Sequence, residues 1–524
     1  MAVVLRENKL NMNEPFHGAA APVASIPTPH PLDRGLLLAE IAAVVVLLAV
    51  AVVIGPYYLV HLPAAGRAGS LALLAAGCVL LLALLGRPGG FLLRHWQAAV
   101  SGLRFPLVIA AGILTQLAVA WLTQPVPNSD GEVYLRLAAQ LSQGQPYMDE
   151  LGHRAFWPPG LPLVLSAFVA LAGANLLAIS LCNLFLYLVG VFSARSLGRA
   201  LFSEQVGTIA ALLFTFWPSR LLTAAVASKE NLTMAAMLAG TAMCVRGLQR
   251  SGQRWQYAAG AGIAFGIAGL AQPGLLLFVM AMPLCYRYFR QGSIWRYLGF
   301  SVIAIGFTML TLLPWQMRNC AQFDSQFCGV ATNGGSVFYR ANNPLATGEW
   351  TAEGQVPITH LPELEQNRLG FALGKQWIME HPGEFAVLAL KKLGLLLRDD
   401  RYGAYWSVLR GGGHAHEKAL ETSSPNRLFA YQALHALSWV FWAIIAGVVA
   451  RALGQLVRQR GSDAAGIMLP LLYPLLYSAA VFSVFESDRR QHMIALALLL
   501  VLAAWAIAGN RGQADAGRPV RVQG

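Results

Sequence analysis

Long apolar runs, repeated along almost the whole chain, restrict the fold more than any other feature. Each is close to the length needed to cross a hydrocarbon layer of about 30 Å. They cover residues 36–60, 69–86, 104–123, 174–197, 206–220, 231–248, 256–272, 274–288, 296–316, 428–450, 464–484 and 491–509. Pro273 either separates two spans or kinks one, so we predict about twelve transmembrane helices, within a range of 11–13. Since a helix satisfies its own backbone in lipid, we expect an all-α polytopic membrane protein.

Composition leads to the same class. Of 524 residues, 56% are hydrophobic and 12% are charged, and the mean hydropathy is +0.52, beyond the range of soluble domains. The net charge of +13 would indicate nucleic-acid binding in a soluble protein. Here the arginines cluster in short connectors between apolar runs, as they do in cytoplasmic loops. We therefore expect no nucleic-acid partner.

The distribution of basic residues predicts the orientation. With the amino terminus inside, the inner connectors and tails hold twenty Lys and Arg, and the short outer loops hold seven. The excess predicts that both termini are cytoplasmic. Residues 1–34 contain no segment that resembles a signal-peptide cleavage site. Four polar stretches then share the outer face, namely residues 128–162, 228–231, 319–426 and 485–492.

These assignments divide the chain into six parts. Residues 319–426 form too long a connection to lack structure, so we expect a small outer-face loop domain and helices lying along the membrane interface. The parts are a disordered cytoplasmic tail (1–34), two additional amino-terminal helices (35–103), a transmembrane core (104–318) with a first outer loop (124–160), the outer insertion (319–426), the carboxy-terminal helices (427–510) and a second cytoplasmic tail (511–524).

Two of the six cysteines, Cys320 and Cys328, fall in the outer insertion. An oxidising compartment would allow them to form a disulfide, which we predict. The other four lie within apolar runs, where a free cysteine acts as a small packing residue.

The first outer loop contains several candidate functional residues. Asp130 follows an apolar run directly, so its carboxylate either caps the helix that follows or acts in catalysis. Glu132 suits the first turn of that helix through the helix dipole. Further on, His153 and Arg154 precede Trp157 and a Pro-Pro-Gly turn. They fit either an interface anchor or the wall of a pocket that binds a lipid-linked substrate.

Two other charged groups begin apolar runs at the same face. Lys229 and Glu230 either cap their helix or place a cation and a carboxylate near Asp130. Arg489 and Arg490 suit phosphate binding, because guanidinium forms bidentate contacts and a helix start adds its dipole. A structural ion pair with Glu486 or Asp488 is the alternative.

The order of these motifs resembles the bacterial C-type (GT-C) glycosyltransferases, which are polytopic relatives of the protein O-mannosyltransferases and of the lipid A aminoarabinose transferase. The motifs are "SDGEVYLRLA" with "WPPGLPL", then "SKEN", then "VATNGGSVFYRANNP", then "FESDRR" before the last apolar run. The similarity extends from about residue 105 to residue 508. It implies the GT-C fold, a place in the bacterial inner membrane, and transfer of a sugar from a polyprenyl-phosphate carrier to an acceptor hydroxyl on the outer, periplasmic side.

The resemblance also implies roles for particular residues. The acidic residue of the first outer loop, the proposed base in that family, corresponds to Asp130, and a second acidic position corresponds to Glu230. The arginine before the final helices corresponds to Arg489 or Arg490. Where the family often has an adjacent Asp-Glu pair, this chain has Asp-Gly-Glu, and "DRRQHMIAL" replaces an Arg-Tyr-Arg run with a following proline.

The chemistry of such a donor fits this residue set. Polyprenyl phosphate is a good leaving group, so one carboxylate can deprotonate the acceptor hydroxyl in a single inverting displacement. Cations must then hold the phosphate as its charge grows. The candidates are Arg154, Lys229, Arg489 and Arg490. We expect no cofactor, since no dinucleotide or P-loop motif is present. A divalent metal is possible but not expected.

Two other functions would also fit a polytopic chain of this kind. One is a lipid-linked oligosaccharide flippase or another transporter, and the other is a polysaccharide polymerase or ligase. A transporter would typically show paired broken helices or an internal repeat, and the sequence shows neither. The expected partners are the lipid-linked sugar donor, a lipid, glycan or protein acceptor, and the membrane.

Overall fold

The computed structural model describes residues 87–100, 102–249, 254–276, 294–350, 357–397, 399–410, 419, 422–460, 462–488 and 490–516. Its elements are all helical in this part of the chain. The predicted spans 36–60 and 69–86, most of the predicted span 274–288, and Arg489 lie outside the described residues.

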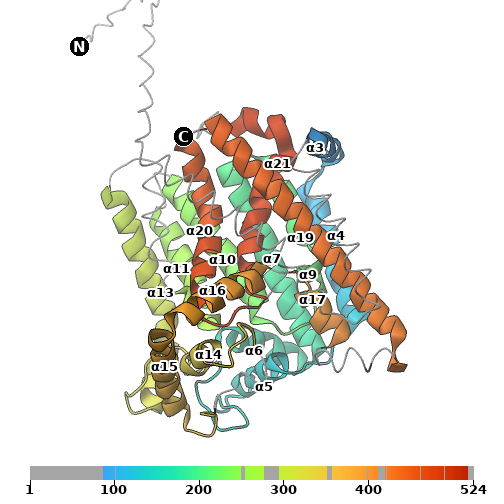
Figure 1. The fold of residues 1–524 in the computed structure, drawn as a ribbon. Helices are drawn as coiled ribbons and strands as arrows, with labels where there is room; N and C mark the ends of the chain where they lie inside the picture. Colours follow the sequence, from blue (N-terminus) through green and yellow to red (C-terminus); the bar gives the residue numbers. More distant parts are fainter. Residues whose placement is uncertain are drawn as a thin grey trace, which may run out of the picture.

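An upright bundle makes up most of the molecule (Figure 1). Its helices are α4 (Phe105–Thr123), α7 (Leu176–Leu201), α8 (Glu204–Thr215), α10 (Lys229–Gln249), α11 (Arg254–Ala271), α13 (Ile294–Gln322), α19 (Pro425–Arg460), α20 (Ser462–Val484) and α21 (His492–Ala516), with α3 (Arg87–Val100) beside the end of α21. The predicted all-α polytopic class is confirmed.

The predicted number of spans is not confirmed. Among the described residues, five helices are long and apolar enough to cross a membrane: α4, α7, α13, α19 as far as Leu456, and α21 as far as Gly509. Helices α10 and α11 coincide with predicted spans but are not among these five. Both contain several Gly and Ala residues, and such small residues allow close helix packing. A Cβ on Gly262 of α11 would lie 2.3 Å from the Ala304 carbonyl oxygen of α13.

Helix α21 is the most enclosed element of the bundle. Every residue from Met493 to Ala508 is at most 5% exposed. The helix packs against α8, α19, α20, α10 and α7, and it begins two residues after Arg490. The backbone next to Arg490 is therefore anchored in the centre of the bundle.

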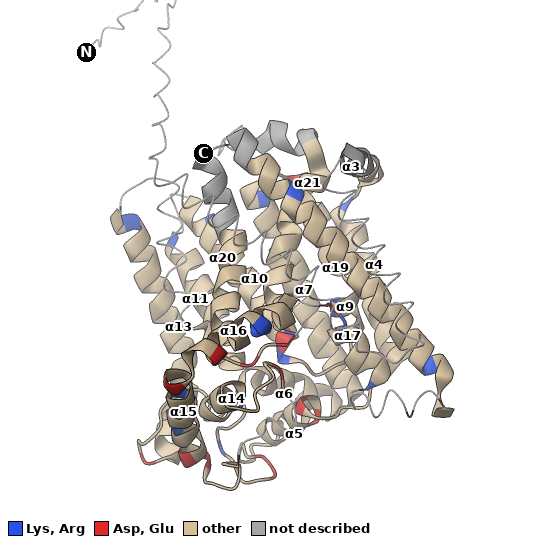
Figure 2. Cartoon of the chain, viewed as in Figure 1, with Lys and Arg blue, Asp and Glu red and all other residues tan. Residues whose placement is uncertain are grey.

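The remaining elements gather at one end of the bundle (Figure 1). They are α5 (Asp130–Ser142), α6 (Gly160–Ala172), α9 (Pro218–Leu222), the 3-10 turn η1 (Pro273–Leu275), α14 (Gly334–Ala341), α15 (Glu363–Glu380), α16 (Pro382–Leu397), α17 (Tyr402–Ala404) and the π-helix η2 (Tyr405–Leu409). Acidic side chains gather around α5, α14 and α15 at this end, whereas the opposite ends of the bundle helices carry mostly Lys and Arg (Figure 2). The four polar stretches of the sequence thus meet at one end.

Candidate active site

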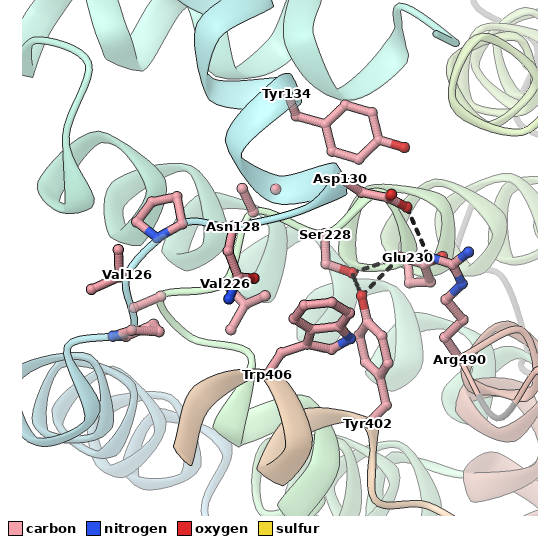
Figure 3. Close-up of a pocket in the computed structure, with 15 residues that line it drawn as sticks. Val126, Asn128, Asp130, Tyr134, Val226, Ser228, Glu230, Tyr402, Trp406 and Arg490 are labelled. Carbon is pink, nitrogen blue, oxygen red and sulfur yellow. Dashed lines mark hydrogen bonds and ion pairs between the residues drawn. The ribbon is translucent and has the colours of Figure 1, made fainter. Parts of the chain in front are cut away.

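A pocket lies where α5, the start of α10, α17 and the segment before α21 meet (Figure 3). It contains about 450 Å³ of space, part of it open to solvent. One side is polar and consists of Asp130, Tyr134, Ser228, Glu230, Tyr402 and Arg490. The other is largely apolar and consists of Pro125, Val126, Pro127, Ala225, Val226 and Trp406. Segments more than 300 residues apart in the sequence therefore build one site.

Arg490 joins the two carboxylates of the pocket. Its Nη1 lies 3.0 Å from Asp130 Oδ2, and its Nε lies 3.7 Å from Glu230 Oε1. One guanidinium thus faces an acidic group from the first outer loop and another from the start of α10. The sequence predicted that these three residues could meet, and the structure brings them together.

The backbone directs Asp130 toward Arg490. Ser129 occupies the N-cap position of α5 with φ of 50°, and its side chain forms no capping hydrogen bond. Positive φ is uncommon for a residue other than glycine and often marks a functional site. Asp130 is the first helical residue, and its side chain remains 34% exposed. Burial would raise its pKa, but the charges of Arg490 and Lys229 outweigh burial and lower the pKa of this carboxyl. Asp130 is consequently ionised at neutral pH.

Glu230 is held by two hydroxyl groups. Its side chain is almost fully buried, and Oε2 accepts a hydrogen bond of 2.7 Å from Ser228 Oγ. The Tyr402 hydroxyl lies 3.1 Å from Ser228 Oγ and 3.4 Å from Glu230 Oε2. Tyr402 and Trp406 come from the outer insertion, and the sequence reasoning did not identify them.

The segment before Arg490 is fixed by the outer insertion. Glu486, the expected alternative partner of the arginines, pairs with Arg340, which donates from Nη2 to Oε2 at 2.8 Å. The Ser487 amide donates to the Gly348 carbonyl at 2.9 Å. Asn342 and Lys392 both donate to the Val484 carbonyl. The "FYRANNP" motif thus holds the segment that carries Arg490.

A second buried group fixes the start of α21. His492 Nδ1 lies 2.8 Å from the Leu396 carbonyl oxygen, which can only accept, so Nδ1 carries a proton. Its Nε2 lies 3.2 Å from Asp400 Oδ1, and Trp217 donates to Asp400 Oδ2. Burial raises the pKa of the Asp400 carboxyl. Sequence reasoning missed Asp400, because "RDD" in a connector has no distinguishing signal.

Other predicted residues lie around the pocket rather than in its wall. Lys229 begins α10, and its charge acts on Asp130, while its ammonium forms no hydrogen bond or ion pair within the described residues. Glu132 is exposed on α5 and does not line the pocket. Both remain predictions as substrate contacts.

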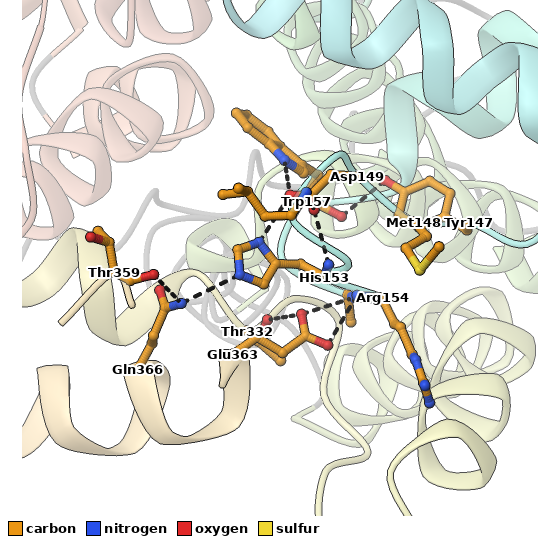
Figure 4. A network of polar contacts seen from close by, with 12 residues as sticks. Tyr147, Met148, Asp149, His153, Arg154, Trp157, Thr332, Thr359, Glu363 and Gln366 are labelled. Carbon is orange, nitrogen blue, oxygen red and sulfur yellow. Dashed lines mark hydrogen bonds and ion pairs between the residues drawn. The ribbon is translucent and has the colours of Figure 1, made fainter. Parts of the chain in front are cut away.

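His153 and Arg154 belong to a separate cluster (Figure 4). His153 Nδ1 lies 3.0 Å from Asp149 Oδ2, and its Nε2 lies 3.3 Å from Gln366 Nε2. Asp149 also accepts from the Trp157 indole. Glu363 accepts from the backbone amides of residues 154 and 155 and from Thr332. We call this set the loop clamp, because it ties the first outer loop to α15.

Two other predictions concern the cysteines and metal binding. Cys320, in the last turn of α13, forms a disulfide with Cys328 in the structure. The described residues include no group of three or more His, Cys, Asp or Glu side chains that could hold a metal ion. The two pocket carboxylates, Asp130 and Glu230, face the guanidinium of Arg490.

Comparison with known proteins gives one family match. Residues 157–315 match the model of the dolichyl-phosphate-mannose-protein mannosyltransferase family. No curated protein matches the chain. Among solved structures, the archaeal oligosaccharyltransferase AglB from Archaeoglobus fulgidus, in complex with an inhibitory peptide and a dolichol-phosphate, overlaps with a TM-score of 0.45 at 12% identity. That overlap covers 77% of this chain but only 50% of the archaeal one.

A second solved structure is ArnT from Cupriavidus metallidurans bound to undecaprenyl phosphate. It overlaps with a TM-score of 0.40 at 15% identity and covers 77% of both chains. The family match spans α6 to α13 and includes the segment that carries Glu230. It agrees with the motif order of the sequence. Residues 157–315 of the chain are therefore similar to the dolichyl-phosphate-mannose-protein mannosyltransferase family.

Proposed function

We propose that this protein transfers a sugar from a polyprenyl-phosphate carrier to an acceptor hydroxyl on the periplasmic side of the membrane. The observation that carries the proposal is the Arg490 guanidinium between Asp130 and Glu230 at the wall of a pocket. The site combines an ionised base with a permanent cation, and transfer from a lipid phosphate requires both.

In the proposed step, Asp130 takes the proton of the acceptor hydroxyl. The acceptor oxygen forms a bond to the anomeric carbon while the bond from that carbon to the phosphate oxygen breaks. Polyprenyl phosphate leaves with the electron pair, and the configuration inverts. The lowered pKa of Asp130 keeps this carboxyl ready to accept a proton at neutral pH.

Arg490 and Lys229 stabilise the departing phosphate in this proposal. Charge on the leaving oxygen grows in the transition state, so a positioned cation lowers the barrier. Arg490 also holds Asp130 in the free protein. When the phosphate arrives, it competes for the same guanidinium, and the base is released as the donor binds. Arg489 stands in the sequence beside Arg490, and its part in phosphate binding stays a prediction.

The proposal is tested by incubating purified protein with a panel of radiolabelled polyprenyl-phosphate sugars and envelope acceptors. We expect transfer from one donor by the wild type and its loss in Asp130→Asn, with donor binding retained. Normal transfer by Asp130→Asn would exclude this residue as the base. If no donor is consumed while a fluorescent lipid-linked glycan crosses liposomes containing the protein, the chain is a transporter instead.

A further inference from the structure

The pocket contains polar atoms whose hydrogen-bonding capacity is unused. Glu230 Oε1 and Arg490 Nε are both buried, and neither has a hydrogen-bond partner among the described residues. They face each other at 3.7 Å, which is beyond hydrogen-bond length. The Glu230 side chain is only 2% exposed. A buried polar atom without a partner carries a desolvation penalty, so two of them in one pocket indicate a missing ligand group.

The chemistry of these atoms restricts what that group can be. A carboxylate oxygen only accepts hydrogen bonds, and an arginine Nε–H only donates them. A phosphate oxygen would satisfy Arg490 but has no proton for Glu230. An ammonium group would satisfy Glu230 but cannot accept from Arg490. A hydroxyl group does both, because it donates one hydrogen bond and accepts others.

Two further features of the pocket fit a ring that carries such hydroxyls. Tyr134 is 2% exposed and lines the pocket, and no described residue forms a hydrogen bond with its hydroxyl (Figure 3). On the other side, Val126, Val226 and Trp406 provide an apolar wall. A sugar ring has hydroxyls at its edges and C–H groups on its faces, so it matches both sides.

The geometry points to a hydroxyl-binding subsite in which Glu230 and Arg490, with Tyr134 beside them, bind a ring hydroxyl of the donor sugar. This inference rests on the proposed function and deepens it. Glu230 then selects the sugar, while Asp130, at the other end of the same guanidinium, takes the proton of the acceptor. The resemblance alone had placed Glu230 with Asp130 in catalysis.

The test measures equilibrium binding of radiolabelled short-chain polyprenyl-phosphate sugars to the purified full-length protein. The probes are the best-bound neutral sugar, its deoxy and deoxyfluoro analogues at each ring position, and polyprenyl phosphate without a sugar. At one ring position we expect the deoxy analogue to bind roughly 10- to 100-fold more weakly, as for a lost hydrogen bond to a charged group. The fluoro analogue should also bind weakly, since fluorine cannot donate to Glu230.

Glu230→Gln identifies the residue responsible. An amide can donate toward fluorine, so the preference for hydroxyl over fluorine at that position should fall by about tenfold. Binding of the sugar-free phosphate should not change. The matched control is Glu204→Gln, which replaces an exposed carboxylate on α8 that pairs with Arg195 and Arg199. It should leave every ratio unchanged.

Three results would overturn the inference. The first is equal binding of the parent and every deoxy analogue, and the second is equal weakening of sugar-bearing and sugar-free phosphate by Glu230→Gln. If Glu230→Gln does not fold, Tyr134→Phe is measured in its place. The third result is then an unchanged sugar affinity in Tyr134→Phe. Because the assay needs no transfer, selective binding without any transfer would reject the proposed reaction and leave the subsite standing.

Discussion

The pocket and the loop clamp are two polar networks at the same end of the molecule, and they differ in how completely their atoms are paired. In the loop clamp, both oxygens of Glu363 accept hydrogen bonds from neighbouring groups, and both ring nitrogens of His153 have neighbours. In the pocket, Glu230 Oε1 and Arg490 Nε form an ion pair at 3.7 Å but have no hydrogen-bond partner among the described residues. A satisfied network holds loops in place, whereas an incompletely satisfied one is suited to receive a ligand.

The largest expected effect is in the pocket. Arg490→Lys keeps the positive charge but removes the fork that reaches Asp130 and Glu230 together, so transfer should fall by roughly 100-fold or more. Sugar transfer at saturating donor is the measurement. Transfer within a few-fold of wild type would mean that the guanidinium only holds the fold together, as the loop clamp does. Arg136→Lys, which changes an arginine on α5 that pairs with Glu150 outside the pocket, is the matched control and should leave transfer unchanged.

The second largest effect should be that of low pH on transfer, through the protonation of Asp130. The pKa of Asp130 is lowered in the folded protein by Arg490 and Lys229, so this base stays ionised below the usual carboxyl range and protonates only as the pH falls further. Transfer should therefore stay level from pH 7 to about pH 5 and decline only in stronger acid. In Arg490→Gln the acid decline should move to higher pH. A wild-type profile that already declines near pH 6 contradicts the assignment of this base.

Glu363→Gln should lower the stability of the protein and leave transfer nearly unchanged, which is the reverse of the effect expected in the pocket. The new amide would place a donor against backbone N–H groups in the loop clamp, which costs on the order of 1–3 kcal/mol of stability. The melting temperature in detergent should fall, while transfer per folded molecule stays within about threefold of wild type. Glu365→Gln, an exposed neighbour on α15, is the control and should change neither. A large loss of transfer without loss of stability would make the clamp part of the active site.

The smallest expected effect is that of chelation. Arg490 faces both pocket carboxylates, so we propose that the reaction needs no divalent cation. Activity in EDTA should stay within about twofold of activity in buffer with added Mg²⁺ or Mn²⁺. Loss of transfer in EDTA, restored by either ion, would show that a cation displaces Arg490 from one of the carboxylates.

The sequence predicted the fold class, and it predicted that Asp130, Glu230 and the pair Arg489 and Arg490 share one face of the membrane, because apolar runs and motif order can be read from one chain. It could not predict Tyr402 or Trp406. These residues reach the pocket only because the end of the outer insertion packs against the start of α10. That arrangement depends on tertiary packing. The same holds for Asp400, whose role depends on His492 and Trp217, both distant in sequence.

For His153 and Arg154, the sequence identified the residues but could not distinguish a structural role from a functional one. Their residue types fit a substrate pocket as well as a structural loop, and only the positions of Asp149, Gln366 and Glu363 show how the loop is paired. The number of spans stays a prediction, because the predicted spans 36–60 and 69–86 and most of 274–288 lie outside the described residues.

The burial of α21 also affects how the site responds to its surroundings. Helices that face lipid adjust their tilt when the thickness of the bilayer changes. From Met493 to Ala508, α21 presents almost no surface to lipid, and its neighbours surround it instead. Arg490, which precedes α21, is therefore shielded from changes in the bilayer. The spacing of Arg490, Asp130 and Glu230 can stay constant in membranes of different thickness.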